Sequence, residues 1–195
     1  ADTVGERTEE AIRAAHARSG QIATLILHAD AAWNETTKTT PSALTFPAPE
    51  RPDAVRIRTA AEALRNGRRT TILVSGKALR EHELETLDLI AQKTGARLLA
   101  QQSNGRMQRG AGRVALDRVP YVIDKAVATF ADTEQVILIS AKAPVGFFAY
   151  PGKPSSMLPE DCETFELVTA EQDAAAAIAA LADEIGGCGL KARLT

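Results

Sequence analysis

The stretch that decides the fold runs from Gln135 to Leu158 and reads QVILISAKAPVGFFAYPGKPSSML. It begins with the apolar run VILI, which ends abruptly in a Ser-Ala pair. A loop follows that holds three prolines, two lysines and the aromatic residues Phe147, Phe148 and Tyr150. A buried strand that leads into an elaborate loop at its carboxyl end is typical of α/β proteins, in which ligands bind at that end of the sheet. We therefore expect the chain to be organised around this strand.

Outward from this stretch, apolar runs alternate with helical patterns. The sequence predicts short strands at 70–74, 97–100, 135–139 and 162–168. It predicts helices at 53–66, 79–94, 118–131 and 170–186. Such alternation implies βαβ units, so we expect an α/β fold with a three-layer, doubly wound and mostly parallel sheet. Because the strands are apolar without alternation, we expect both faces of the sheet to be covered.

The beginning of the chain has a different organisation. The sequence predicts a helix over 3–19 and a short apolar strand, IATLIL, over 22–27. The Thr- and Pro-rich segment that follows favours an extended linker. We therefore expect a remnant of a preceding domain, a linker, a main α/β domain and an outgoing linker, at 1–33, 34–50, 51–187 and 188–195.

Composition and charge exclude several classes of protein. The net charge of −2 argues against a dedicated nucleic-acid binder. No apolar run approaches the ~20 residues of a membrane span, and the polar start does not resemble a signal peptide. Two cysteines, Cys162 and Cys188, fit a reducing cytoplasm rather than a disulfide framework. We expect a cytoplasmic protein without nucleic-acid or membrane partners.

The first strand of the main domain ends in Ser75, Gly76 and Lys77. Backbone N–H groups of such a turn, at the start of a helix, can hold a phosphate group. The motifs GxGxxG and GxxxxGK followed by Ser or Thr are both absent. A tight strand-to-helix turn without a ligand is the alternative, and we favour it at this stage.

Two loops are further candidates. The loop 101–116 carries Arg106, Arg109 and Arg113 without an acidic residue, so it is either a phosphate clamp or a solvated basic loop, and we favour the second. The loop 142–158 either shapes a ligand pocket or packs on a partner domain. Exposed aromatic and proline clusters mark interfaces more often than chemistry, so we favour docking.

The remaining reactive side chains form no constellation. His16, His28 and His82 are scattered and have no Cys or carboxylate at metal-ligand spacing. Cys162 begins a predicted buried strand and is expected to be an inert core thiol. We therefore assign no catalytic and no metal-binding residue.

Three segments carry a family resemblance. AIRAAHARSGQIATLILHADAAWNE resembles the end of the pyrimidine-binding domain of thiamine-diphosphate-dependent enzymes. TTILVSGKALREHELETLDLIAQKTGARLLAQ resembles the opening of their central domain. VILISAKAPVGFFAYPGKPSSMLPEDCETFEL resembles the later half of that domain in acetolactate-synthase-like large subunits. The resemblance implies a Rossmann-like central domain that is mainly structural.

The resemblance also implies what the parent enzyme needs. It would decarboxylate or ligate 2-oxo acids with thiamine diphosphate and Mg²⁺. In the family, a GDG…NN motif holds the metal and the diphosphate, and this chain contains no GDG. The chain alone is therefore not expected to catalyse. Its expected partners are the missing pyrimidine- and diphosphate-binding domains and further copies in a dimer or tetramer.

In some members of the family, the strand ends of the central domain bind FAD or an ADP group. By position, the matching residues follow two strands of this chain: Ser75, Gly76 and Lys77, then Ser140, Ala141 and Lys142. Two other hypotheses therefore stay open. The chain could be a nucleotide-binding module for FAD, ADP or coenzyme A, or a module that only docks other domains.

Overall fold

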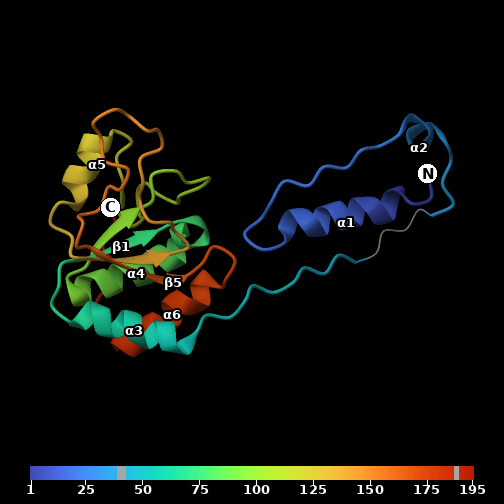
Figure 1. Ribbon diagram of the computed structural model, residues 1–195. Coiled ribbons are helices and arrows are strands. Elements are labelled where there is room, and N and C mark those ends of the chain that lie inside the picture. The colour runs from blue at the N-terminus through green and yellow to red at the C-terminus, as the bar shows by residue number, and fades with distance from the viewer. Residues whose placement is uncertain (39–42, 187–188) are drawn as a thin grey trace. The chain divides into compact units, whose positions relative to one another are not determined.

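The computed structural model describes residues 1–38, 43–186 and 189–195. The chain divides into two compact units, Ala1–Pro49 and Glu50–Thr195 (Figure 1). The predicted linker 34–50 ends beside this division, and its residues 39–42 lie outside the described residues.

The second unit, the α/β unit, is built on a parallel sheet of five strands in the order β3-β2-β1-β4-β5. The strands are β1 (Thr70–Val74), β2 (Arg97–Ala100), β3 (Asp117–Arg118), β4 (Gln135–Ile139) and β5 (Glu163–Val168). The α-helices are α3 (Ala54–Arg65), α4 (Glu81–Thr94), α5 (Ile123–Phe130) and α6 (Ala174–Ile185). The short 3-10 helix η1 (Gly76–Leu79) lies between β1 and α4. The predicted α/β fold is therefore confirmed.

Helices cover both faces of the sheet. Because side chains alternate along a strand, Ile72 of β1 packs into a core with α3, α4 and α6, whereas Leu73 packs into a second core with α5. Figure 1 shows α3, α4 and α6 on one side of the sheet and α5 on the other. All residues of β1 and β4 are buried, as expected for central parallel strands.

The ends of the sheet differ from the prediction. β5 was expected to be covered on both faces, but four of its six residues are not buried, because it is an edge strand. The helix predicted over 118–131 begins only at Ile123. Pro120 disfavours helical backbone at Val119, and the residues just before it form β3, which was not predicted.

Helix ends in the α/β unit follow local sequence signals. Asp53 caps α3 by accepting a hydrogen bond from the N–H of Val55 at 2.7 Å. Gly95 ends α4 in the left-handed conformation, at φ 74°. These ends agree with the predicted helices 53–66 and 79–94, and they fix where α3 begins and where α4 ends.

The first unit contains α1 (Val4–His16) and α2 (Ala29–Trp33), and neither has a buried residue. The strand predicted over 22–27 is wrong for this chain, because no described segment pairs with it. Ile22 is 96% exposed and Ile26 is 78% exposed. An apolar run has strand propensity, but a strand forms only when a neighbour satisfies its backbone groups.

The end of the chain, expected as an outgoing linker, contacts the α/β unit. Leu194 bridges Val114 in antiparallel fashion, and the N–H of Thr195 donates to the carbonyl of Arg113 at 3.0 Å. Arg193 reaches α4, where its Nε and Nη2 atoms donate to Asp88 at 3.0 and 2.6 Å. Residues 187 and 188, where the predicted domain passes into the linker, lie outside the described residues.

Asp88 is only 3% exposed, so its negative charge is stabilised by these hydrogen bonds rather than by water. Burial by itself raises the pKa of Asp88, but hydrogen bonds from Arg193 and Gln92 outweigh it and hold the pKa below its ordinary value of 3.8. A carboxylate with a depressed folded pKa stabilises the fold above its unfolded pKa. That stabilisation is lost as the pH falls through the folded pKa.

Arg193→Ala should lower the free energy of unfolding near neutral pH by about 2 kcal/mol, because it removes two charged hydrogen bonds from a buried carboxylate while the exposed guanidinium limits the loss. The deficit relative to the wild type should shrink in acid, below the ordinary pKa of Asp88. Urea unfolding at several pH values measures both effects. Arg58→Ala, at an exposed position on α3, is the control. Equal losses in both variants would contradict this role of the tail.

Candidate functional site

The candidate site lies at the carboxyl edge of the sheet, between β1 and β4. From β1 the chain passes through α4 to β2 on one side, whereas β4 lies on the other side of β1. Neighbouring strands whose connections lead in opposite directions form a topological switch point, where α/β proteins bind ligands most often. The sheet order therefore selects the ends of β1 and β4.

The structure brings together at this edge the two predicted residue triplets, 75–77 after β1 and 140–142 after β4. The N–H of Ser75 donates to the carbonyl of Ile139 at 3.1 Å. A Cβ atom placed on Gly76 would lie 3.8 Å from the Cβ of Ser140. The turn after β1 and the turn after β4 are thus in direct contact, although Gly76 and Ser140 lie 64 positions apart in the sequence.

Two residues that the sequence prediction missed close this edge. Asn104 accepts a hydrogen bond from the hydroxyl of Ser75 at 2.8 Å. Gln101 accepts one from the backbone N–H of Lys142 at 2.9 Å. Gln101 directly follows β2 and Asn104 lies three residues later, so amide side chains just after a strand were the available signal. They link the arginine-rich loop to both triplets.

The backbone at this edge is constrained. Gly76 has φ 59°, a conformation that glycine adopts readily, and Ser140 has φ 52°, which is uncommon for a residue with a side chain. The hydroxyl of Ser140 donates to the carbonyl of Thr169 at 3.3 Å. Strained residues of this kind persist where the surrounding structure holds them, often at functional sites.

The charged side chains near the edge do not form a clamp. Arg113 pairs with Glu81 at 3.0 Å, at the start of α4. Arg106 and Arg109 are exposed, as are Lys77 and Lys142. One of the three predicted clamp arginines is therefore engaged in an ion pair, which favours a solvated basic loop for the other two.

The described histidines and Cys162 are scattered over the chain. Among the described residues, no group of three His, Cys, Asp or Glu side chains could hold a metal ion. The ring of His16 packs against Phe46, with centroids 4.6 Å apart, and His28 precedes α2. Burial raises the pKa of the Cys162 thiol, with Arg68 opposing and Glu163 adding to the effect. A raised pKa lowers the fraction of thiolate, the nucleophilic form. Cys162 was expected to begin a buried strand, but it is half-buried and directly precedes β5.

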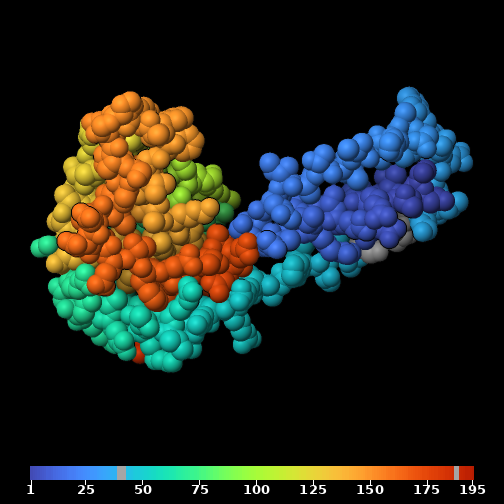
Figure 2. All heavy atoms as spheres, in the orientation of Figure 1, coloured from blue at the N-terminus to red at the C-terminus, as the bar shows by residue number. Residues whose placement is uncertain are grey.

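The loop 142–158 connects β4 to β5, two parallel neighbours. Such strands need a long crossover, usually a helix, and here the loop takes that place. Met157, 2% exposed, anchors it in the core shared with α5. Phe147, Phe148 and Tyr150 stack edge to face and remain exposed. In Figure 2 this loop, in orange, forms one end of the α/β unit.

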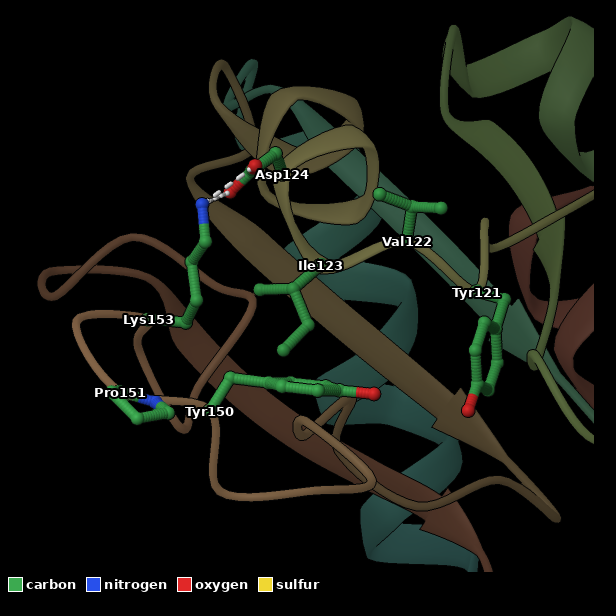
Figure 3. A pocket seen from close by; sticks show the side chains of 7 residues that line it. All are labelled: Tyr121, Val122, Ile123, Asp124, Tyr150, Pro151 and Lys153. Carbon is green, nitrogen blue, oxygen red and sulfur yellow. Dashed lines mark hydrogen bonds and ion pairs between the residues drawn. The ribbon is translucent and has the colours of Figure 1, made fainter.

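Two hollows adjoin this loop. One, of about 380 Å³, lies between residues 121–124, at the start of α5, and Tyr150, Pro151 and Lys153 (Figure 3). The other, of about 400 Å³, extends from Gly146 to Ser155 and shares those last three residues. Sequence reasoning considered a pocket in this loop but did not foresee that Tyr121 would form its opposite wall.

Solved structures of other proteins share this architecture. The chain has the fold of part of a protein from Mycobacterium smegmatis described as a "putative thiamin diphosphate-dependent enzyme", with a TM-score of 0.69 and 18% identity, covering 100% of this chain and 40% of that one. A thiamine diphosphate-dependent 4-hydroxybenzoylformate decarboxylase from Rhodococcus jostii gives a TM-score of 0.68 at 14% identity, with the same coverage. The fold is therefore that of part of thiamine-diphosphate-dependent enzymes.

A protein of similar sequence gives a more specific comparison than these structures. The chain is 40% identical over 183 residues to a protein of Mycobacterium tuberculosis named "Putative acetolactate synthase large subunit IlvX". The match covers 93% of this chain and 34% of the relative, so the chain spans about a third of that protein. No family model matches the chain. The resemblance to thiamine-diphosphate-dependent, acetolactate-synthase-like proteins is confirmed.

Gly76→Ala should destabilise the α/β unit by about 1 kcal/mol, because alanine resists the positive φ at this position. Gly105→Ala is the matched control, since that glycine has an ordinary φ and no atom within 4 Å of an added Cβ. Urea unfolding monitored by circular dichroism compares the two. A control variant that loses as much stability as Gly76→Ala would contradict the constraint at the β1–β4 edge.

Proposed function

We propose that this chain is the central domain, with the end of the pyrimidine-binding domain, of a thiamine-diphosphate-dependent, acetolactate-synthase-like enzyme. The parent would decarboxylate a 2-oxo acid and join the resulting fragment to a second carbonyl compound. The observation that carries the proposal is 40% identity over 183 residues to the protein named "Putative acetolactate synthase large subunit IlvX". The shared fold supports it.

The role proposed for this chain within the parent is structural. Thiamine diphosphate and Mg²⁺ would supply the electron sink and the diphosphate anchor, but the residues at the β1–β4 edge do not fit them. Serine, glycine, lysine, asparagine and glutamine line that edge, whereas protein sites for Mg²⁺ usually supply one or two carboxylates. We therefore place cofactor binding in the other two thirds of the parent, outside this chain.

The first unit supports a larger parent. Neither α1 nor α2 buries a residue, and Ile22 and Trp33 are 96% and 86% exposed. The run 22–27 is apolar on both faces, the pattern of a strand inside a parallel sheet. We propose that residues 1–33 complete a preceding domain, and that the parent assembles as a homo-oligomer.

The assay of this proposal compares two proteins. The parent should form acetolactate from pyruvate only when thiamine diphosphate and Mg²⁺ are both present, and the 195-residue chain alone should form none. Product formation can be followed by the colorimetric acetoin reaction after acid treatment. Turnover by the isolated chain, or turnover by the parent without thiamine diphosphate, would overturn the proposal.

A second function, nucleotide binding, is favoured by the contact between the Ser75 and Ser140 turns at the switch point. It predicts that FAD, ADP or coenzyme A binds the chain with a micromolar dissociation constant. Calorimetry with each of the three measures this directly. Lys142→Ala should weaken binding if the exposed ammonium contacts a phosphate. The absence of heat with all three nucleotides would remove this function.

A further inference from the structure

We propose that the hollow between α5 and the loop 142–158 binds an uncharged aromatic small molecule. Its volume of about 380 Å³ lies within the range of small-molecule sites, which begins at roughly 300 Å³. The inference concerns residues that neither the β1–β4 edge nor the proposed function uses, and it stands independently of both.

The hollow is held in shape by contacts on both of its sides. The Nζ atom of Lys153, in the loop, donates to both carboxylate oxygens of Asp124, in α5, at 2.8 and 2.7 Å (Figure 3). The N–H of Gly146 donates to the carbonyl of Ser155 at 2.8 Å, and Val145 bridges Ser156. The loop is thus closed on itself and fastened to the helix, which lowers the cost of ordering a ligand site.

The loop backbone also lies close to the wall of the hollow. A Cβ atom on Gly146 would lie 3.4 Å from Cδ1 of Ile123 and 3.5 Å from the carbonyl oxygen of Phe148. Ile123 itself is 7% exposed and belongs to the core around α5. One wall is therefore a fixed part of the core.

The walls favour a flat apolar ligand. Two tyrosine rings, Tyr121 and Tyr150, are 60% and 49% exposed and face the hollow from different segments. Val122, Ile123 and Pro151 add aliphatic surface to the lining. Aromatic rings stack or pack edge to face with other rings, and each such pair contributes about 0.5–1.5 kcal/mol beyond the area buried.

The polar groups of the hollow favour an uncharged ligand. The only charged residues of its lining, Lys153 and Asp124, neutralise each other. In Figure 3 the hydroxyl groups of Tyr121 and Tyr150 lie at the end of the hollow away from this ion pair. Phenol hydroxyls donate and accept hydrogen bonds. A ring with one neutral hydrogen-bonding group, such as a phenol or an indole, matches this lining.

Saturation-transfer NMR on the 195-residue chain, with indole, phenol, cyclohexanol and benzoate as probes, tests the site. Indole and phenol should bind with dissociation constants of about 1 mM or below. Cyclohexanol, which lacks the aromatic face, and benzoate, which carries a charge, should bind at least ~5-fold more weakly.

Three variants locate the binding. Tyr150→Ala should weaken the binding of indole about 10-fold, because it removes one aromatic wall. Phe147→Ala is the matched control: its ring is 73% exposed on the same loop but does not line the hollow, so affinity should stay within about 2-fold. Asp124→Asn frees the Lys153 ammonium and should strengthen benzoate binding about 3-fold or more.

Circular dichroism establishes that each variant is folded. The proposal is overturned if the wild type gives no saturation transfer with indole at about 10 mM, a concentration well above the expected dissociation constant. It is also overturned if folded Tyr150→Ala binds indole as the wild type does.

Discussion

The pairing of β1 with β4 is the interaction on which the rest of the structure depends. Five residues of each strand pair in parallel register, from Thr70 with Gln135 to Val74 with Ile139, and all ten are buried. Helices then cover both faces, because successive side chains point to opposite cores. The same pairing places the turn after β1 against the turn after β4. The candidate edge and the start of the loop that shapes the hollow are therefore both consequences of one strand pair.

The sequence predicted these elements where hydrophobic burial and local signals agree. β1 and β4 are continuous apolar runs, and Asp53 and Gly95 are ordinary helix-end residues, so their positions were predictable. β3 was not, because Asp117 and Arg118 are both exposed and give no hydrophobic signal. The strand predicted over 22–27 was wrong for the opposite reason. It has the composition of a buried strand, but strand formation depends on a partner sheet that local sequence does not encode.

The candidate site was likewise predictable only in part. The two triplets were predictable from their positions after apolar strands and from the family resemblance. Their closure by Gln101 and Asn104 was not, because it depends on the path of an irregular loop. The hollow beside α5 required the three-dimensional structure as well, since Tyr121 and Tyr150 lie on different segments that meet only after the crossover folds back. The loop is thus a structural crossover first, and its exposed aromatic residues are free for recognition.

Hydrogen–deuterium exchange on the 195-residue chain, resolved by peptide, tests most directly whether the β1–β4 pair organises an autonomous domain. Amides of residues 70–74 and 135–139 should exchange most slowly, through global unfolding of the α/β unit. Amides of residues 22–27 should exchange nearly as fast as in an unstructured peptide, because no described strand pairs with them. Rapid exchange in β4, or strong protection of residues 22–27, would contradict this account.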